Sequence, residues 1–210
     1  PGGERARLDP AVSGETIHSV RILVKGTVQK LVIESSIVGA IAEDDGGAII
    51  ELEVKDSIID SVVPGVPAIE TNLRDVSLER VTVLGDIDVE RLYASELFAD
   101  GDIKVLDNQR SCVRFSAIRP VIAPDGFRRP DMVELPESPS MLSSTRFGDP
   151  DYCRLSERAP KEIRRGAENG SEIGAFSGEL APIKLRDLKA KVSEYAPFGL
   201  VAQFVSSCEE

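Results

Sequence analysis

The chain has no tryptophan, a single histidine and three cysteines among its 210 residues. The lone His18 removes most His-based metal and catalytic arrangements, since those need further ligands or a nucleophile placed around the ring. We expect His18 to be a surface or core-edge residue. Cys112, Cys153 and Cys208 are odd in number and far apart, which is typical of reduced thiols and favours a cytoplasmic protein without a disulfide framework.

Aromatic and basic residues are also scarce. Aromatics make up 5% of the chain, which disfavours stacking platforms for sugars or single-stranded nucleic acid. The 25 Lys and Arg stand against 36 Asp and Glu, for a formal charge of −11. Such an acidic surface repels phosphate backbones, and no apolar run approaches the roughly 20 residues of a membrane helix. We therefore expect no nucleic-acid partner and no membrane insertion.

The sequence starts Pro1-Gly2-Gly3, with neither an initiating Met nor a basic and then apolar leader. These features predict that no secretory signal is present and that a longer parent chain has been cut. The remaining composition, 41% hydrophobic and 29% charged, is typical of a globular fold with a substantial core.

Short runs of Val, Ile and Leu, separated by Gly, Asp and Ser, dominate the chain from about Ser19 to Ile118. Such runs predict strands, and no stretch with helical periodicity interrupts them. The strand candidates are Val20–Val24, Leu31–Ile33, Ile37–Ile41, Ala48–Val54, Ser57–Val63, Val76–Leu84, Ile87–Val89, Tyr93–Phe98, Ile103–Leu106 and Cys112–Ile118.

Several of these runs resemble one another. Segments 32–41, 52–61 and 78–87 share a loose design, and Ser36, Ser57 and Thr82 recur at intervals of 21 and 25 residues. A repeat of this length, built from short strands and turns, predicts a right-handed parallel β-helix over residues 1–120. An antiparallel β-sandwich is the alternative, but the hairpin signals it needs are nearly absent.

Residues 121–210 differ in character. Prolines at 120, 124, 130, 136, 139 and 150 predict an irregular arm lying on the coils. Helices are expected at Ala159–Gly166 and Pro182–Tyr195, and a last strand at Leu200–Val205. The second helix has an apolar face, so we expect it to dock on the β-helix and cover an open end. That face consists of Ile183, Leu185, Leu188, Val192 and Tyr195.

Acidic residues cluster at Gly-containing turns. Asp86, Asp88, Asp100 and Asp102 could supply oxygen ligands to Ca²⁺, or a carboxylate pair of the kind that glycosidases use. Asp and Gly are also the ordinary residues of tight bends. We favour the turn interpretation and predict no catalytic residue, no cofactor and no metal site, with these four aspartates as weak Ca²⁺ candidates.

Two further patterns have structural interpretations. The Glu79-Arg80 and Glu90-Arg91 pairs predict salt-bridge ladders on the solvent face. The glycine-rich segment 166–174 matches neither the dinucleotide nor the phosphate-loop pattern, and it predicts a structured loop with positive φ at its glycines.

Six segments together carry a resemblance that spans the chain from about Leu52 to Val205. They are LEVKDSIID, LERVTVLGDIDVERLYASELF, SCVRFS, RFGDPDY, GAENGSEIGAF and EYAPFGLVAQFV. In this order they resemble the C-terminal part of large bacterial proteins encoded beside phage-tail-like baseplate components in contractile-injection gene clusters. The resemblance implies a tail-related structural or accessory role and assigns no catalytic residue.

The sequence as a whole favours a non-enzymatic structural or assembly component that acts with protein partners and can form oligomers. Two alternatives stay open at this point. A carbohydrate-active β-helix, a lyase or a glycosidase, would need carboxylates that converge in a groove. A module that binds a protein or a glycan would need an exposed apolar patch.

Overall fold

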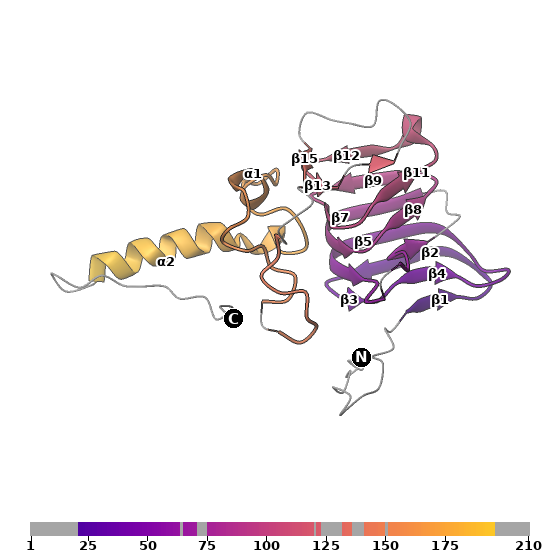
Figure 1. Ribbon diagram of the computed structural model, residues 1–210, viewed down its shortest axis with the longest axis horizontal. Coiled ribbons are helices and arrows are strands. Elements are labelled where there is room, and N and C mark those ends of the chain that lie inside the picture. The colour runs from indigo at the N-terminus through magenta and orange to yellow at the C-terminus, as the bar shows by residue number, and fades with distance from the viewer. Residues whose placement is uncertain are drawn as a thin grey trace.

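The computed structural model describes residues 21–63, 65–70, 75–119, 121–122, 132–135, 141–149 and 151–195. The chain winds as a parallel β-solenoid of about five turns, followed by a small helical region (Figure 1). The parallel β-helix prediction is thereby confirmed, because every pairing between the named strands is parallel, which an antiparallel sandwich does not allow. His18, Cys208 and the strand candidate 200–205 lie outside the described residues.

One sheet is made of the short strand that opens each turn. Its members stack in chain order as β1 (Ile22–Val24), β4 (Ile41–Glu43), β6 (Ile69–Glu70), β8 (Ile87–Val89), β11 (Ile103–Val105) and β14 (Val121–Ile122). The stacking aligns one isoleucine per turn, because Ile22 pairs with Ile41, Ile41 with Ile69, Ile69 with Ile87 and Ile87 with Ile103. This isoleucine column fills the interior, and the residues from Ile41 onward are no more than 1% exposed.

The second sheet holds the longer strands. They are β2 (Thr27–Glu34), β3 (Ile37–Val38), β5 (Ala48–Asp60), β7 (Asp75–Leu84), β9 (Leu92–Ser95), β10 (Phe98–Ala99), β12 (Cys112–Arg114), β13 (Ala117–Ile118) and β15 (Val133–Glu134). Because β14 and β15 extend the two sheets, the coils continue beyond the boundary expected at residue 120.

Each turn bends sharply within this sheet. The residue at the bend has a left-handed φ of 47° to 58° in all five turns. These residues, which we call the bend column, are Ser35, Asp56, Arg80, Glu96 and Phe115. Left-handed φ is unfavourable for side chains other than glycine, so it has to be maintained by contacts between neighbouring turns.

Serines after the bend supply some of those contacts. Ser57 Oγ accepts the N–H of Ser36 at 3.1 Å and donates to the carbonyl of Lys55. Ser116 Oγ likewise accepts the N–H of Leu97 at 3.1 Å, one turn away. The small hydroxyl residue recognised in the repeat therefore satisfies backbone groups that the bend removes from the ladders.

The register of the repeat differs from the sequence-based alignment by one residue. Ser57 lies beside Val81, and Thr82 lies beside Ile58. Equivalent positions are 21 residues apart between the first two turns, 24 between the next two, and 16 and 19 farther along. The turns therefore differ in the length of their loops while the bend keeps its place.

The outer face of the sheet after the bend, which we call the third face, is unusually apolar. Ile58, Thr82, Phe98 and Ala117 occupy neighbouring positions on it and are all buried. Residues 141–180 cover this face, and they include the short helix α1 (Lys161–Arg164), whose Ile163 packs with Phe98. We expected the C-terminal region to cover an open end of the coils, and instead it covers their side (Figure 1).

The last helix, α2 (Ala181–Tyr195), forms close to where it was predicted and extends away from the coils (Figure 1). Its apolar face was expected to dock. That expectation is wrong for the described side chains, since Leu188 is 50% and Tyr195 is 86% exposed. Neither helix of the described chain is long and apolar enough to span a membrane.

Candidate functional site at the bend column

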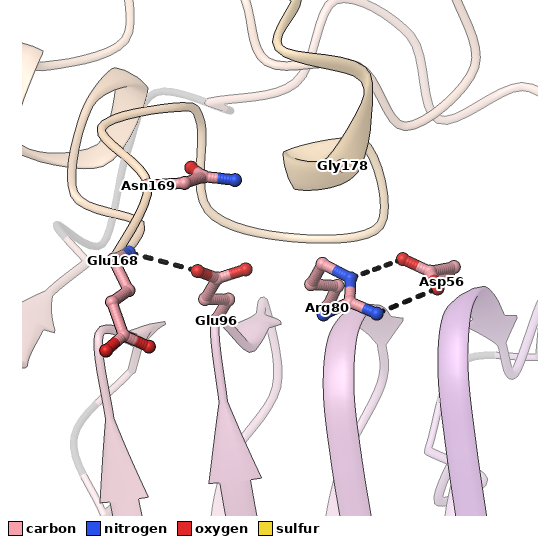
Figure 2. A pocket seen from close by; sticks show the side chains of 6 residues that line it. All are labelled: Asp56, Arg80, Glu96, Glu168, Asn169 and Gly178. Atoms are coloured by element: carbon pink, nitrogen blue, oxygen red, sulfur yellow. Dashed lines mark hydrogen bonds and ion pairs between the residues drawn. The ribbon is translucent and has the colours of Figure 1, made fainter.

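A cavity of about 530 Å³ opens where residues 168–178 pass over the bend column. Figure 2 shows the residues that line it, which are Asp56, Arg80, Glu96, Glu168, Asn169 and Gly178. Three of the six belong to the bend column, so the left-handed bend is what aims their side chains out of the coils toward the covering loop.

Arg80 and Asp56 form a two-point ion pair between neighbouring turns. Arg80 Nε donates to Asp56 Oδ1 at 2.5 Å, and Nη2 donates to Oδ2 at 3.0 Å. Arg80 also contacts the Glu79 carboxylate through Nη1. The hydrogen bonds that Arg80 donates to Asp56 are the main reason that the pKa of Arg80 lies above its ordinary value, despite partial burial. Both oxygens of Asp56 are therefore already engaged by a cation.

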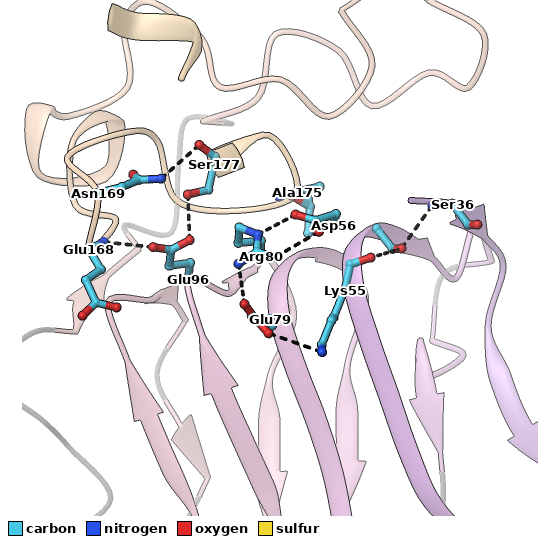
Figure 3. A network of polar contacts seen from close by, with 12 residues as sticks. Ser36, Lys55, Asp56, Glu79, Arg80, Glu96, Glu168, Asn169, Ala175 and Ser177 are labelled. Atoms are coloured by element: carbon cyan, nitrogen blue, oxygen red, sulfur yellow. Dashed lines mark hydrogen bonds and ion pairs between the residues drawn. The ribbon is translucent and has the colours of Figure 1, made fainter. Parts of the chain in front are cut away.

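Glu96 is the acceptor that fastens the loop. Glu96 is buried, with only 6% of its surface exposed. Oε1 accepts the N–H of Glu168 at 3.0 Å, and Oε2 accepts the hydroxyl of Ser177 at 2.7 Å (Figure 3). The backbone carbonyl of Glu96 also accepts the N–H of Gly174 at 3.0 Å. One residue of the coils thus holds the covering loop at three points.

The loop approaches the coils closely beside this carboxylate. Gly174 has a φ of +113°, and a Cβ there would lie 2.7 Å from Thr82 Oγ1. The same hydroxyl accepts the N–H of Ala175 at 3.0 Å. Gly170 also has a positive φ, so the structured loop predicted for 166–174 is confirmed at these two glycines.

A second attachment lies on the third face. The hydroxyl of Tyr152 donates a hydrogen bond to Asp60 Oδ2 at 2.6 Å. The pKa of Tyr152 is raised above its ordinary value mainly by burial and, to a smaller degree, by this hydrogen bond. The neighbouring Cys153 is 2% exposed, and burial raises the pKa of its thiol to about 12. A thiol that stays protonated is inert as a nucleophile, so Cys153 fits a packing role. Cys112 and Cys153 are both free, as the cysteine pattern predicted.

Glu172 and the neighbouring Ser171 are exceptions to this pattern of paired groups, since each has a buried side-chain oxygen without a hydrogen-bond partner among the described residues. Glu172 is 6% exposed, and the oxygen without a partner is its Oε1. Burial raises the pKa of its carboxyl group, and the charges that act on it belong to Arg154, Glu179 and Arg164. Sequence reasoning placed Glu172 only within a glycine-rich loop and did not identify it as buried.

Three of the four aspartates considered as Ca²⁺ candidates have carboxylates that are used in other ways, and the fourth, Asp102, is exposed. Asp86 Oδ1 accepts the N–H of Asp102 at 2.9 Å, which is the turn role that the sequence favoured. Asp88 pairs with Lys104 at 3.0 Å, and Asp100 pairs with Arg119 at 2.6 Å. Within the described ranges, no three His, Cys, Asp or Glu side chains gather in a way that could hold a metal ion.

The salt-bridge ladder predicted for the solvent face is confirmed. Arg91 lies 3.4 Å from Asp75, 3.6 Å from Glu90 and 3.1 Å from Asp107, so it links three successive turns. The hydrogen bond with Asp107 raises the pKa of Arg91 above its ordinary value and lowers that of Asp107. The carboxylates that pair with Arg91 are 29% to 46% exposed, so solvent screens these pairs and their contribution to stability is small.

Comparisons with protein-family models, with curated proteins and with solved structures find no match to this chain. In the cavity, the carboxylates of Asp56 and Glu96 are occupied by Arg80, by the Glu168 N–H and by the Ser177 hydroxyl. Such an arrangement joins two parts of one chain and leaves these two carboxylates little capacity for a ligand.

Proposed function

We propose that this protein is a non-enzymatic structural component of a larger protein assembly, of the phage-tail-like kind that its sequence resembles. In this role the coils are a rigid spacer, and the C-terminal region is fixed on their side as an attachment. The partners are other proteins, and assembly takes place in the cytoplasm, which suits the free Cys112 and Cys153.

The observation that carries this proposal is that the two carboxylates which the coils place in the bend cavity have both oxygens engaged. Both oxygens of Asp56 accept from Arg80, and both oxygens of Glu96 accept from the covering loop. A general acid or base needs a carboxyl group that can exchange a proton with a substrate. Asp56 and Glu96 instead serve as fasteners, which supports a mechanical role for this corner over a catalytic one.

The exposed aromatic residues argue in the same direction. Tyr93 stands on β9, Phe147 belongs to the covering region and packs edge-on against Tyr152, and Tyr195 ends α2. They do not form a pair of platforms on one surface of the described coils. A glycan-binding module usually presents aromatic faces on which sugar rings stack, so this arrangement favours protein partners.

The test has two arms. A tagged full chain in its host should sediment in a particle far heavier than its own 22.7 kDa. Recovery of the tagged chain only at its own mass would contradict an assembly role. In the second arm, the purified chain is incubated with a panel of polysaccharides and new reducing ends are measured.

We expect no new reducing ends from the wild-type chain or from the Glu96→Gln and Asp86→Ala variants. Depolymerisation that disappears in Glu96→Gln, while circular dichroism shows an unchanged fold, would replace the structural role with a carbohydrate-active one. Asp86→Ala is the matched control, because its carboxylate caps a turn at the surface and lies outside the cavity.

A further inference from the structure

Helix α2 carries a narrow apolar seam. Leu188, Val192 and Tyr195 follow one another at spacings of four and three residues, and Leu185 precedes them by three in the sequence. Spacings that alternate between three and four place these positions on one side of a helix, in the pattern of coiled-coil core positions. The seam thus has four core positions over 11 residues.

The seam has no cover within the described part of the chain. Leu188 and Tyr195 are exposed and Val192 is only partly buried. The helix stands apart from the coils in Figure 1, so the described residues leave the seam in water. An exposed row of large apolar residues on a helix is a common mark of a docking surface.

Lysines flank the seam on both sides. Lys184 and Lys191 stand one residue before seam positions, and Lys189 stands one residue after Leu188. In a coiled coil these are the positions whose charges face the partner helix. Lys189 Nζ already lies 4.0 Å from Glu157 Oε1, so a flanking lysine of this helix pairs with a carboxylate inside the chain itself.

The charges of the flanking lysines decide which kind of helix can bind the seam. A second copy of α2, parallel or antiparallel, would bring lysine against lysine, which is destabilising. A helix flanked by Asp or Glu would instead gain ion pairs. The contrast with the coils is marked, because α2 has four basic and two acidic residues while residues 21–119 have eleven basic and eighteen acidic ones.

A membrane surface is the less favourable occupant. Interfacial helices present a broad apolar face that is rich in Trp, Phe and Leu. The seam of α2 is narrow, and the helix contains neither Trp nor Phe. The acidic body to which it is attached would also be repelled by anionic lipid.

We propose that α2 binds, through Leu188, Val192 and Tyr195, a helix of a partner protein whose own apolar seam is flanked by Asp or Glu. This inference rests on the proposed assembly role and deepens it by stating the chemistry of the partner. The contact fits a helix-to-helix joint with the flanking lysines supplying specificity.

The probe is a pair of designed peptides, each about three heptads long, with Ile and Leu in the seam. One peptide has Glu at the flanking positions and the other has Lys. Each is labelled with fluorescein and titrated with the full-length chain while anisotropy is recorded at low and at high salt. We expect the Glu peptide to bind about tenfold or more tightly than the Lys peptide, and its binding to weaken with salt.

Two variants and a control sharpen the result. Leu188→Asp should abolish binding of the Glu peptide. The double variant Lys184→Glu/Lys191→Glu should exchange the preference, so that the Lys peptide binds more tightly. Lys161→Glu changes the same charge on α1, away from the seam, and should leave the preference unchanged. Circular dichroism verifies that each variant retains the helix.

Several outcomes would overturn the inference. They are no binding of either peptide, equal binding of both, a doubled mass in solution that Leu188→Asp reverses, or binding to phosphatidylserine vesicles in place of the Glu peptide. The sedimentation test of the assembly role is independent of these outcomes. A chain that sediments in a large particle but ignores the Glu peptide would refute only the partner chemistry.

Discussion

The coils and the C-terminal region of this protein keep their shapes by different means. The coils are joined turn to turn by parallel strand pairing and by side-chain columns such as Ile41, Ile69 and Ile87. Residues 141–180 are held to the third face by a small apolar contact and by a few hydrogen bonds that end on Asp60, Thr82 and Glu96.

This difference indicates how each region should respond to substitutions that remove a contact. A missing side chain in a column affects the turns above and below it, so its effect spreads through the coils. A missing fastener releases only the segment it holds, in the manner of a local opening. Four substitutions test this contrast, beginning with the one that should cost the most stability.

The largest effect is expected from Ile87→Ala in the middle of the isoleucine column. Ile87 is 1% exposed, and truncation leaves a cavity between two turns. The free energy of unfolding should fall by about 2–5 kcal/mol, measured by urea denaturation followed by far-UV circular dichroism. Asp102→Ala, at an exposed position, is the control and should change it by about 0.5 kcal/mol or less. Equal losses in the two variants would show that the column is not what holds the turns together.

The next effect is expected from Ile163→Ala in α1. Ile163 is fully buried and joins α1 to Phe98 on the third face. Loss of this contact should weaken docking of residues 141–180 by about 2–4 kcal/mol. Hydrogen exchange should show faster amides there while β5 and β7 keep their protection. If the strands lose protection to the same degree, the two regions form one cooperative unit and the contrast fails.

A smaller effect is expected at the bend cavity. Glu96→Ala removes both acceptors and leaves the Glu168 N–H and the Ser177 hydroxyl without partners, at a cost of about 1–3 kcal/mol to docking of the loop. Glu96→Gln keeps one acceptor oxygen and should lose less. The measurement is exchange of the Glu168 amide, with Glu168→Gln as the control because that side chain is exposed. Unchanged exchange of this amide in Glu96→Ala would mean that the carboxylate does not fasten the loop.

The smallest effect concerns Glu172 and depends on pH. Its pKa is raised by burial above the ordinary value of 4.5. The stability that the protein gains by burying the neutral carboxyl group is therefore fully present below a pH of about 4.5. It is lost as the pH rises through the folded-state pKa. Glu172→Gln should melt higher than the wild-type chain at pH 7, and the difference should shrink as the pH falls toward 4.5.

Comparison of the two proteins at each pH is needed because other carboxyl groups oppose this trend. Hydrogen bonds from Lys30 and Lys55 lower the pKa of Glu53 to about 2, so its contribution is lost as the pH falls from 4.5 toward 2. A melting difference between Glu172→Gln and the wild-type chain that is constant with pH would show that Glu172 does not titrate as a buried carboxyl group.

The coils could be predicted from the sequence because their signal is local. Short Val, Ile and Leu runs between Gly, Asp and Ser indicate strands wherever they occur. The register is not local, because the connection between β5 and β6 adds residues whose number no strand pattern reveals. The alignment of Ser57 with Thr82 was therefore wrong by one residue, and Val81 occupies that place.

The sequence does contain a pattern that predicts the covered third face. Ile58-Ile59, Phe98-Ala99 and Ala117-Ile118 are pairs of neighbouring apolar residues in strands, and both members of each pair are buried. In a strand such neighbours point to opposite faces. These pairs therefore indicated that the coils are covered on the outside here, along their side.

The bend cavity lay beyond sequence reasoning. Glu96 stands between Ser95 and Leu97 as a single acidic residue, and nothing beside it distinguishes it from the other surface carboxylates. Its partners Glu168 and Ser177 are 72 and 81 residues away. A hydrogen bond across that separation depends on how the whole chain returns to the coils, which local patterns do not encode.

The bend column has a consequence for changes in chain length. Turns of 16, 19, 21 and 24 residues all return to the same left-handed bend. Extra residues are thus absorbed elsewhere in each turn, as in the connection between β5 and β6. A foreign epitope inserted there would be displayed without shifting the stack, whereas the same insertion beside Arg80 would misalign every turn above it.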